Sequence, residues 1–393
     1  MDQLKISGYL DKFEHELFES VLPFWETHSP DFENGGFYNC LDRQGKVYDT
    51  RKHVWLQGRQ TWMFSKLYRN VERNPNWLKL AKNGADFLLN KTLTENDRVY
   101  FAVNEQGKGL WMQRKIFSEC FWIMALAEYS RASGDKSYLQ HTERLFKKVW
   151  EWSKDLSKVG QPTYEGAEPL VQLAIPMILL NLIEEVAGAN FSEFETQINE
   201  CIDRVMLHVH PARQLVFEQV APNGEFVNNM DGRLLNPGHA SEAGWFLQHW
   251  AGHTKNAELS KTAINMVRWS HDKGWDDEYG GLYYFLDSEG HSPTQLEWNM
   301  KLWWPHTEAM YAHLLNYSIT KDESDFKKFE QVVDYSFTHF SDAEYGEWFG
   351  YLSREGKRTH HFKGGPYKGC FHVPRALYLC WQLLSKLESD PQL

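Results

Sequence analysis

One short pattern recurs along this chain of 393 residues, and its spacing constrains the fold more than any other feature. Each of five copies is an aromatic, β-prone run followed by a polar turn that ends on glycine, which is typical of a β-hairpin. The copies are GGFYNCLDRQG, DRVYFAVNEQG, QLVFEQVAPNG, YGGLYYFLDSEG and YGEWFGYLSREG, and they end at Gly45, Gly107, Gly224, Gly290 and Gly356. These glycines are 62 to 66 residues apart except for one gap of 117, in which QPTYEGAEP places Gly166 in a degenerate sixth copy.

Two helical patterns lie between consecutive turns, for example VWLQGRQTWMFSKLYRNV followed by WLKLAKNGADFLLNKTL. In each, apolar residues recur at the i, i+3, i+4 and i+7 spacing of an amphipathic helix. Six intervals would hold twelve helices if the C-terminal helix PRALYLCWQLLSKL pairs with the N-terminal helix LDKFEHELFESVLPFW. A helical-hairpin repeat that closes on itself predicts an all-α (α/α)6 barrel with short β-hairpins in its connecting loops. No Pro/Gly/Ser-rich linker interrupts the pattern, so we expect a single domain over residues 1–393.

Charge and composition exclude several classes of partner. The chain has 42 Lys and Arg against 53 Asp and Glu, a net charge of -11 without long basic runs, so nucleic acid is not expected to bind. The N-terminus is charged throughout, and the longest apolar run, LAIPMILLNLI, is far shorter than the roughly 20 residues of a membrane span. The five scattered cysteines do not have metal-ligand spacing. We therefore expect a cytoplasmic protein with reduced cysteines, no membrane contact and no metal site.

The repeat register points to candidate chemistry, because equivalent positions in a closed barrel converge at one end of its axis. Counted from the closing glycines, Arg59 is 14 residues on, His239 and Pro305 are 15 and His372 is 16. This places His239, His306 and His372 at or just before the N-termini of inner helices. Such positions offer unpaired N–H groups and partial positive charge, which stabilise an anion and disfavour protonation of imidazole. A neutral histidine beside an oxyanion site is suited to proton transfer.

Other features leave more than one interpretation open. The tryptophans Trp303, Trp304 and Trp348 are core residues by default, but rings on repeat-equivalent loops could also line a sugar pocket. The segment KGGPYKGC is glycine-rich and basic, yet it lacks the strand, the spacing and the terminal Ser or Thr of a phosphate-binding loop. Its signal for a nucleotide site is therefore weak, and the sequence favours a mobile loop.

Long segments of the chain resemble the N-acylglucosamine 2-epimerase family, and within it the branch that acts on N-acetylglucosamine (the renin-binding protein branch). The segments that carry the resemblance are VYDTRKHVWLQGRQTWMFS, IFSECF, LAIPMILLNL, GRLLNPGHASEAGWF, GGLYYFLD, PTQLEWNMKLWWPHTEAM, DAEYGEWFGYLSREGK and KGGPYKGCFHVPRA. The related cellobiose and mannose epimerases share the histidine pair but differ from KGCFHVPR in their C-terminal motif. The resemblance implies an (α/α)6 barrel, as the repeats do.

The resemblance also implies roles for residues at matching positions. His239 and His372 would be the acid/base pair, Arg59 would lie over the sugar's carbonyl oxygen, and Glu308 would orient a histidine or assist ring opening. Further substrate contacts would come from Glu242, Lys301, Trp303, Trp304 and His306. The reaction would interconvert N-acetyl-D-glucosamine and N-acetyl-D-mannosamine through an enediolate at C2. No cofactor is required for this chemistry, while ATP as an allosteric activator and a homodimer are implied by the family alone.

Three alternative functions stay open at this point. An epimerase or aldose-ketose isomerase of unsubstituted sugars, such as mannose or cellobiose, shares the enediolate, and no single residue identifies the group on C2. A glycoside hydrolase would use Glu242 and Glu308 as its two carboxylates, but it does not require the paired histidines. A non-catalytic interaction protein would not require the His, Arg and Glu set.

Overall fold

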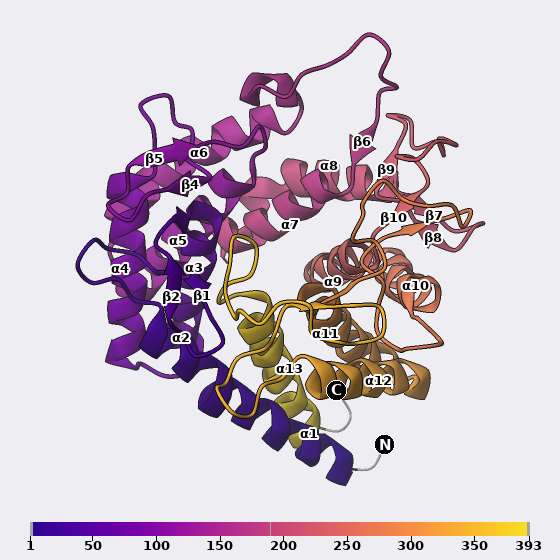
Figure 1. Cartoon of the computed structure of the whole chain (residues 1–393). Coiled ribbons are helices and arrows are strands. Elements are labelled where there is room, and N and C mark those ends of the chain that lie inside the picture. Colours follow the sequence, from indigo (N-terminus) through magenta and orange to yellow (C-terminus); the bar gives the residue numbers. More distant parts are fainter. Residues whose placement is uncertain (1–2, 189, 391–393) are drawn as a thin grey trace.

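The computed structural model describes residues 3–188 and 190–390 of the chain, and it is built from helical hairpins arranged in a ring (Figure 1). Six helices face the centre: α3 (Val54–Asn70), α5 (Phe117–Ser133), α7 (Ala174–Ala187), α9 (Pro237–Thr254), α11 (Trp303–Thr320) and α13 (His372–Ser389). Five outer helices follow the first five of these: α4 (Pro75–Lys91), α6 (Leu139–Trp152), α8 (Glu195–Met206), α10 (Ala257–Gly274) and α12 (Glu323–His339).

The sixth outer layer is made by the N-terminal segment, which packs against the C-terminal helix. This segment comprises α1 (Gln3–His15), the π-helical turn η1 (Glu16–Val21) and α2 (Leu22–His28), and α1 lies beside α13. Three 3-10 turns, Lys136–Tyr138, Leu156–Val159 and Phe191–Phe194, complete the helical elements. The predicted all-α (α/α)6 barrel is therefore confirmed, including the pairing of the first helical segment with the last.

Short strands join the repeats at one end of the barrel. They are β1 (Cys40–Leu41), β2 (Val47–Asp49), β3 (Lys52–His53), β4 (Ala102–Val103), β5 (Gly109–Trp111), β6 (Val171–Gln172), β7 (Val209–His210), β8 (Leu215–Val216), β9 (Gln219–Val220), β10 (Leu234–Leu235), β11 (Leu286–Asp287), β12 (Lys301–Leu302) and β13 (Tyr351–Leu352). In four antiparallel pairs, β3–β4, β6–β9, β10–β11 and β12–β13, the strand before an inner helix pairs with the turn strand of the next repeat. These pairs connect consecutive repeats above the helix N-termini.

The turns predicted at the five closing glycines form, although their strands pair in two ways. All five glycines have positive φ values between 77° and 88°, a conformation that side chains disfavour. The turns at Gly45 and Gly107 lie in local hairpins, β1–β2 and β4–β5. At the other three turns the preceding strand pairs with the previous repeat instead. The degenerate copy around Gly166 is a turn in which Ala167 N–H donates to the Tyr164 carbonyl, without a strand between residues 161 and 170.

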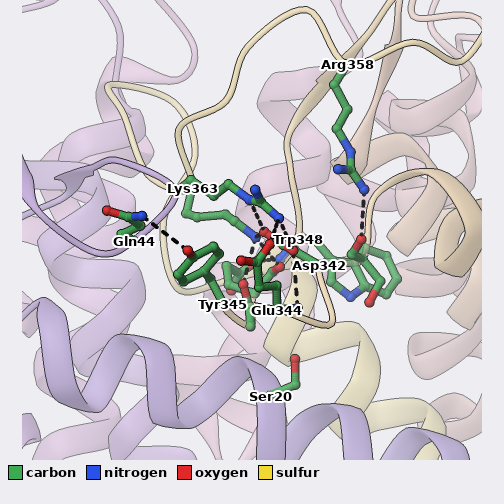
Figure 2. A network of polar contacts seen from close by, with 12 residues as sticks. Ser20, Gln44, Asp342, Glu344, Tyr345, Trp348, Arg358 and Lys363 are labelled. Carbon is green, nitrogen blue, oxygen red and sulfur yellow. Dashed lines mark hydrogen bonds and ion pairs between the residues drawn. The ribbon is translucent and has the colours of Figure 1, made fainter.

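A network of polar contacts closes the ring between its first and last repeats (Figure 2). Arg43, in the β1–β2 turn, donates from Nε to Asp342 Oδ2 at 2.8 Å, and Lys363 Nζ lies 3.0 Å from the same carboxylate oxygen. Gln44 Nε2 donates to the Tyr345 hydroxyl at 3.2 Å. The loops that precede α3 and α13 are thereby fixed to one another.

The opposite ends of the inner helices are tied together by ion pairs. Glu128 of α5 accepts from Arg69 Nε of α3 at 2.7 Å and from Arg131 at 2.6 Å. Lys66 of α3 donates to Glu185 of α7 at 3.2 Å. These side chains hold the C-terminal halves of α3, α5 and α7 together, at the end of the barrel away from the β-strands.

The structure also bears on the expectations for membrane contact and for the cysteines. Within residues 3–188 and 190–390, the helices are all too short or too polar to cross a membrane. The five cysteines are buried and free of disulfides.

Candidate active site

A cavity of about 640 Å³ opens at the end of the barrel where the loops lead into the inner helices. All six inner helices contribute to its walls. The lining includes six of the residues predicted to form the site: Arg59, His239, Glu242, Trp303, Trp304 and His372. Glu308 lies behind the wall in contact with His372. The repeat register thus brings side chains from four different helices into one cavity.

The two histidines lie at the mouths of their helices, as predicted. His239 is the third residue of α9, whose N-cap Asn236 accepts from the His239 backbone N–H at 3.1 Å, and His372 is the first residue of α13. Three charged residues, Arg59, Glu242 and Glu308, are each the sixth residue of their helix. Because one turn contains 3.6 residues, these groups lie about one turn below the first residues of the helices.

Glu218 holds His239 in place through a carboxylate that the sequence analysis did not identify. The Nδ1–H of His239 donates to Glu218 at 3.0 Å and 2.9 Å, contacting both carboxylate oxygens. Burial alone would lower the pKa of His239, but the negative charge of Glu218 outweighs it and the pKa is raised. The protonated form of His239 is therefore stabilised relative to a free imidazole, and Nε2 is the ring nitrogen that Glu218 does not bind.

His372 has the opposite protonation preference. Its Nδ1–H donates to Glu308 Oε1 at 2.7 Å, and Trp245 Nε1–H donates to the other oxygen of Glu308 at 2.9 Å. Burial and the nearby guanidinium groups of Arg59 and Arg375 lower the pKa of His372 well below its usual range. The cavity therefore contains one imidazole with a raised pKa and one with a lowered pKa.

Arg375 connects the two carboxylates and was also missed at the sequence level. Its guanidinium donates from Nη2 to Glu242 Oε1 at 2.6 Å and to Glu308 Oε1 at 2.7 Å. Arg375 lies three residues after His372, so the i, i+3 spacing within FHVPRA is the signal that could have found it. Glu242, Glu308 and His372 are close enough to surround a metal ion, but the guanidinium already lies between the two carboxylates and balances their charge.

Arg59 forms no ion pair with a carboxylate of the described residues, in contrast to Arg375, although the charges of Glu242 and Glu308 act on it. Its guanidinium lies over the rings of Phe121, Trp55 and Phe371 at 4.1, 5.0 and 5.1 Å, and its buried Nε lacks a hydrogen-bond partner among the described residues. Burial lowers the pKa of Arg59 to about 9. A desolvated donor that lines a cavity and has no acceptor is arranged to bind an anionic oxygen.

Trp304 lies between the two histidines. Its ring centroid is 5.2 Å from the ring of His239 and 5.9 Å from the ring of His372. Trp303 also lines the cavity, so the sugar-pocket interpretation fits the positions of both residues. Trp348, in contrast, is a buried core residue whose Nε1–H donates to Glu16 at 2.7 Å.

The structure places two predicted substrate contacts, His306 and Lys301, outside the cavity lining. His306 is fully buried, and its nitrogens bond the Leu302 carbonyl at 2.6 Å and the Leu282 N–H at 2.9 Å. Burial lowers its pKa to about 3. Lys301 is fully buried as well, with Nζ 3.1 Å from Asp276. Both side chains are engaged within the fold, so the structure does not support their predicted contact with a ligand.

The buried ion pair between Lys301 and Asp276 is expected to contribute to the stability of the fold. Replacement of Asp276 by alanine is expected to lower the free energy of unfolding by about 3–5 kcal/mol, because it leaves the Lys301 ammonium buried and unpaired. Urea unfolding followed by circular dichroism would measure this loss. The control is Glu278→Ala, since Glu278 also binds Arg354 but is 61% exposed, and its loss is expected to cost less than about 1 kcal/mol. Equal effects of the two substitutions would contradict the structural role of Lys301.

The segment KGGPYKGC is held in place by its own lysines. Lys363 and Lys368 are both fully buried, and their ammonium groups pair with Asp342 at 3.0 Å and Glu347 at 2.8 Å. Neither lysine is therefore available for a phosphate group.

Known proteins resemble this chain along its whole length. The model of the family described as N-acylglucosamine 2-epimerase (GlcNAc 2-epimerase) matches residues 36–376. The N-acylglucosamine 2-epimerase of Bos taurus is 44% identical over 99% of this chain and 94% of its own length. A cellobiose 2-epimerase of Ruminococcus albus is 25% identical over 96% of this chain and 98% of its own length.

The fold also has counterparts among solved structures. The cellobiose 2-epimerase from Bacillus thermoamylovorans matches with a TM-score of 0.81 at 22% identity, and the match covers 97% of this chain and 100% of that one. This structural likeness shows that the barrel fold is shared. The match to the family model and the 44% identity show similarity in the amino-acid sequence as well. On this evidence the chain belongs to the N-acylglucosamine 2-epimerase family.

Proposed function

We propose that the protein interconverts N-acetyl-D-glucosamine and N-acetyl-D-mannosamine by removing and returning the proton on C2. The observation that carries the proposal is the histidine pair in one cavity, with a raised pKa at His239 and a lowered pKa at His372. A reaction that takes a proton from one face of a carbon and returns one to the other face needs a base and an acid together. The name of the Bos taurus relative supports the choice of sugar.

The proposal gives each side chain a role. The aldose ring opens, and the neutral imidazole of His372 removes the proton α to the C1 aldehyde while protonated His239 supplies one to C2. Reaction in the opposite direction reverses these roles. Arg59 stabilises the oxygen of the enediolate as charge develops on it. Glu218 and Glu308 bind Nδ1 of the two histidines, so both rings present Nε2 to the substrate.

The carboxylates argue against the glycoside hydrolase. Glu242 and Glu308 both accept from Nη2 of Arg375, so one guanidinium bridges the two carboxylates, and Glu308 is not among the residues that line the cavity. A hydrolase needs both carboxyl groups exposed to the substrate, one on each side of the glycosidic bond. The pair is therefore better suited to orienting His372 and Arg375 than to cleaving a glycosidic bond.

The test offers N-acetylmannosamine, N-acetylglucosamine, mannose and cellobiose separately to the enzyme in D2O and follows each by NMR. We expect the two acetamido sugars to interconvert with deuterium incorporated at C2. Turnover of mannose or cellobiose, with neither acetamido sugar changed, would favour the unsubstituted-sugar alternative. A ketose product would identify an aldose-ketose isomerase instead.

We also propose, from the family resemblance alone, that ATP is an allosteric activator and that no cofactor takes part in the chemistry. In the same assay, ATP is expected to raise the rate without being consumed. Release of one ADP per turnover would contradict this proposal. The expected homodimer and cytoplasmic location stay predictions, and sedimentation analysis of the purified protein would test the first of them.

A further inference from the structure

The polarity of the cavity wall differs from one inner helix to another. Charged or imidazole side chains enter it from α3, α9 and α13, and Trp303 and Trp304 enter it from α11. The remaining two inner helices, α5 and α7, lie next to each other in the ring and contribute apolar side chains alone: Phe117, Phe121, Ala174, Met177 and Ile178. One side of the cavity thus carries the groups for proton transfer and anion binding. On the other side the helices α5 and α7 are apolar, and the polar groups Lys115 and Gln172 lie on the segments that lead into them.

The ring order places α7 relative to the reacting groups. Consecutive inner helices contact one another from α3 to α13. The ring closes where Phe371, the N-cap residue of α13, packs against Trp62 of α3 with ring centroids 5.5 Å apart. In a ring of six, α7 therefore adjoins α9, which carries His239, and lies across the cavity from α13, which carries His372. Met177 and Ile178 of α7 line the same cavity as the two histidines, on its apolar side.

The parts of an open-chain sugar can be matched to these surfaces by polarity. The proton on C2 must meet the histidines, and the C1 oxygen must meet Arg59. The hydroxyl-bearing carbon chain needs hydrogen-bonding partners, which the loops at the cavity mouth supply through Lys115, Gln172, Tyr284, Glu297, Tyr351 and His360. The apolar wall is then left for the group attached to C2.

We propose that Met177 and Ile178 of α7 form the pocket that receives the acyl methyl group of a 2-acylamino sugar and so select it over a 2-hydroxy sugar. The inference rests on the proposed function and adds the residues that determine its substrate. A methyl group gains free energy when it is buried against apolar side chains. A 2-hydroxyl group at the same wall loses its hydrogen bonds to water and finds no replacement there.

The test changes the size of the pocket and the length of the acyl chain together. The values of kcat/KM are measured for N-acetyl- and N-butanoylmannosamine with the wild type, Met177→Ala, Ile178→Ala and Ile175→Ala. Ile175 is the matched control, because it lies on the same helix but does not line the cavity. In Met177→Ala or Ile178→Ala, the ratio of butanoyl to acetyl activity is expected to rise at least about tenfold, since hydrophobic pockets discriminate one or more methylenes by 10- to 200-fold.

The outcomes separate this inference from the proposed function. A ratio that stays at the wild-type value in both cavity variants, while they still epimerise N-acetylmannosamine, would overturn the acyl pocket and leave the function intact. An equal rise in Ile175→Ala would also overturn it, because the effect would then be general loosening of α7. Failure of the wild type to turn over either acylated sugar would overturn the proposed function and the pocket with it. Two cavity variants are used so that poor folding of one leaves the other decisive.

Discussion

Replacement of either His239 or His372 by asparagine is expected to reduce epimerisation by at least about 10²- to 10⁴-fold, the usual contribution of general acid/base catalysis. Asparagine keeps a polar side chain but cannot exchange a proton at neutral pH. The two histidines are held by different carboxylates, Glu218 and Glu308, so each substitution leaves the other histidine in place. The rate of epimerisation is measured by NMR on purified variants, with circular dichroism as the check on folding.

The same two variants can distinguish a mechanism with two catalytic bases from a mechanism with a single base. Because each histidine would serve one face of C2, a variant that lacks one of them is expected to retain exchange of the C2 proton for one epimer while failing to epimerise. Loss of exchange from both epimers in both variants would instead favour a single base, with rotation of the intermediate about a carbon-carbon bond. Near-wild-type epimerisation by both variants would mean that these rings only complete the helix N-termini.

The sequence predicts the barrel well because its evidence is local and repeated. Each helix has its own apolar periodicity and each turn its own glycine, so twelve helices and their order follow without any knowledge of the tertiary contacts. The strand pairs between repeats, such as β12 with β13, could not be predicted in the same way. They are two residues long and join segments about 50 residues apart, so no local pattern encodes their partner.

The candidate site was predictable where it depends on register and not where it depends on contacts between helices. His239 and His372 follow from the positions of helix starts. Glu218 meets His239 across the turn that precedes α9, and nothing in the run QLVFEQV distinguishes it from the other residues of a strand. His306 shows the converse: it lies two residues beyond Trp304, which is about 200° around the helix, so it faces away from the cavity that Trp304 lines.

Arg59→Met is expected to lower kcat by about 10²- to 10³-fold, the usual cost of removing one donor from an oxyanion site. Methionine can retain much of the packing between the rings of Trp55, Phe121 and Phe371 while it removes the charge. The guanidinium of Arg59 is desolvated and forms no ion pair within residues 3–188 and 190–390, so its loss is also expected to raise the free energy of unfolding. A lower rate together with higher stability is the signature of a group retained for function.

Arg375→Met is the matched control, because the same change is made to a buried arginine of the same cluster. Arg375 pairs with Glu242 and Glu308, so its removal leaves two buried carboxylates without a counter-charge and is expected to cost about 3–5 kcal/mol of stability. Urea unfolding of the two variants should therefore shift in opposite directions. If Arg59→Met is destabilised as much as Arg375→Met, Arg59 is a structural cation of the barrel. If it keeps the wild-type kcat, the enediolate oxygen must be stabilised by the helix N-termini alone.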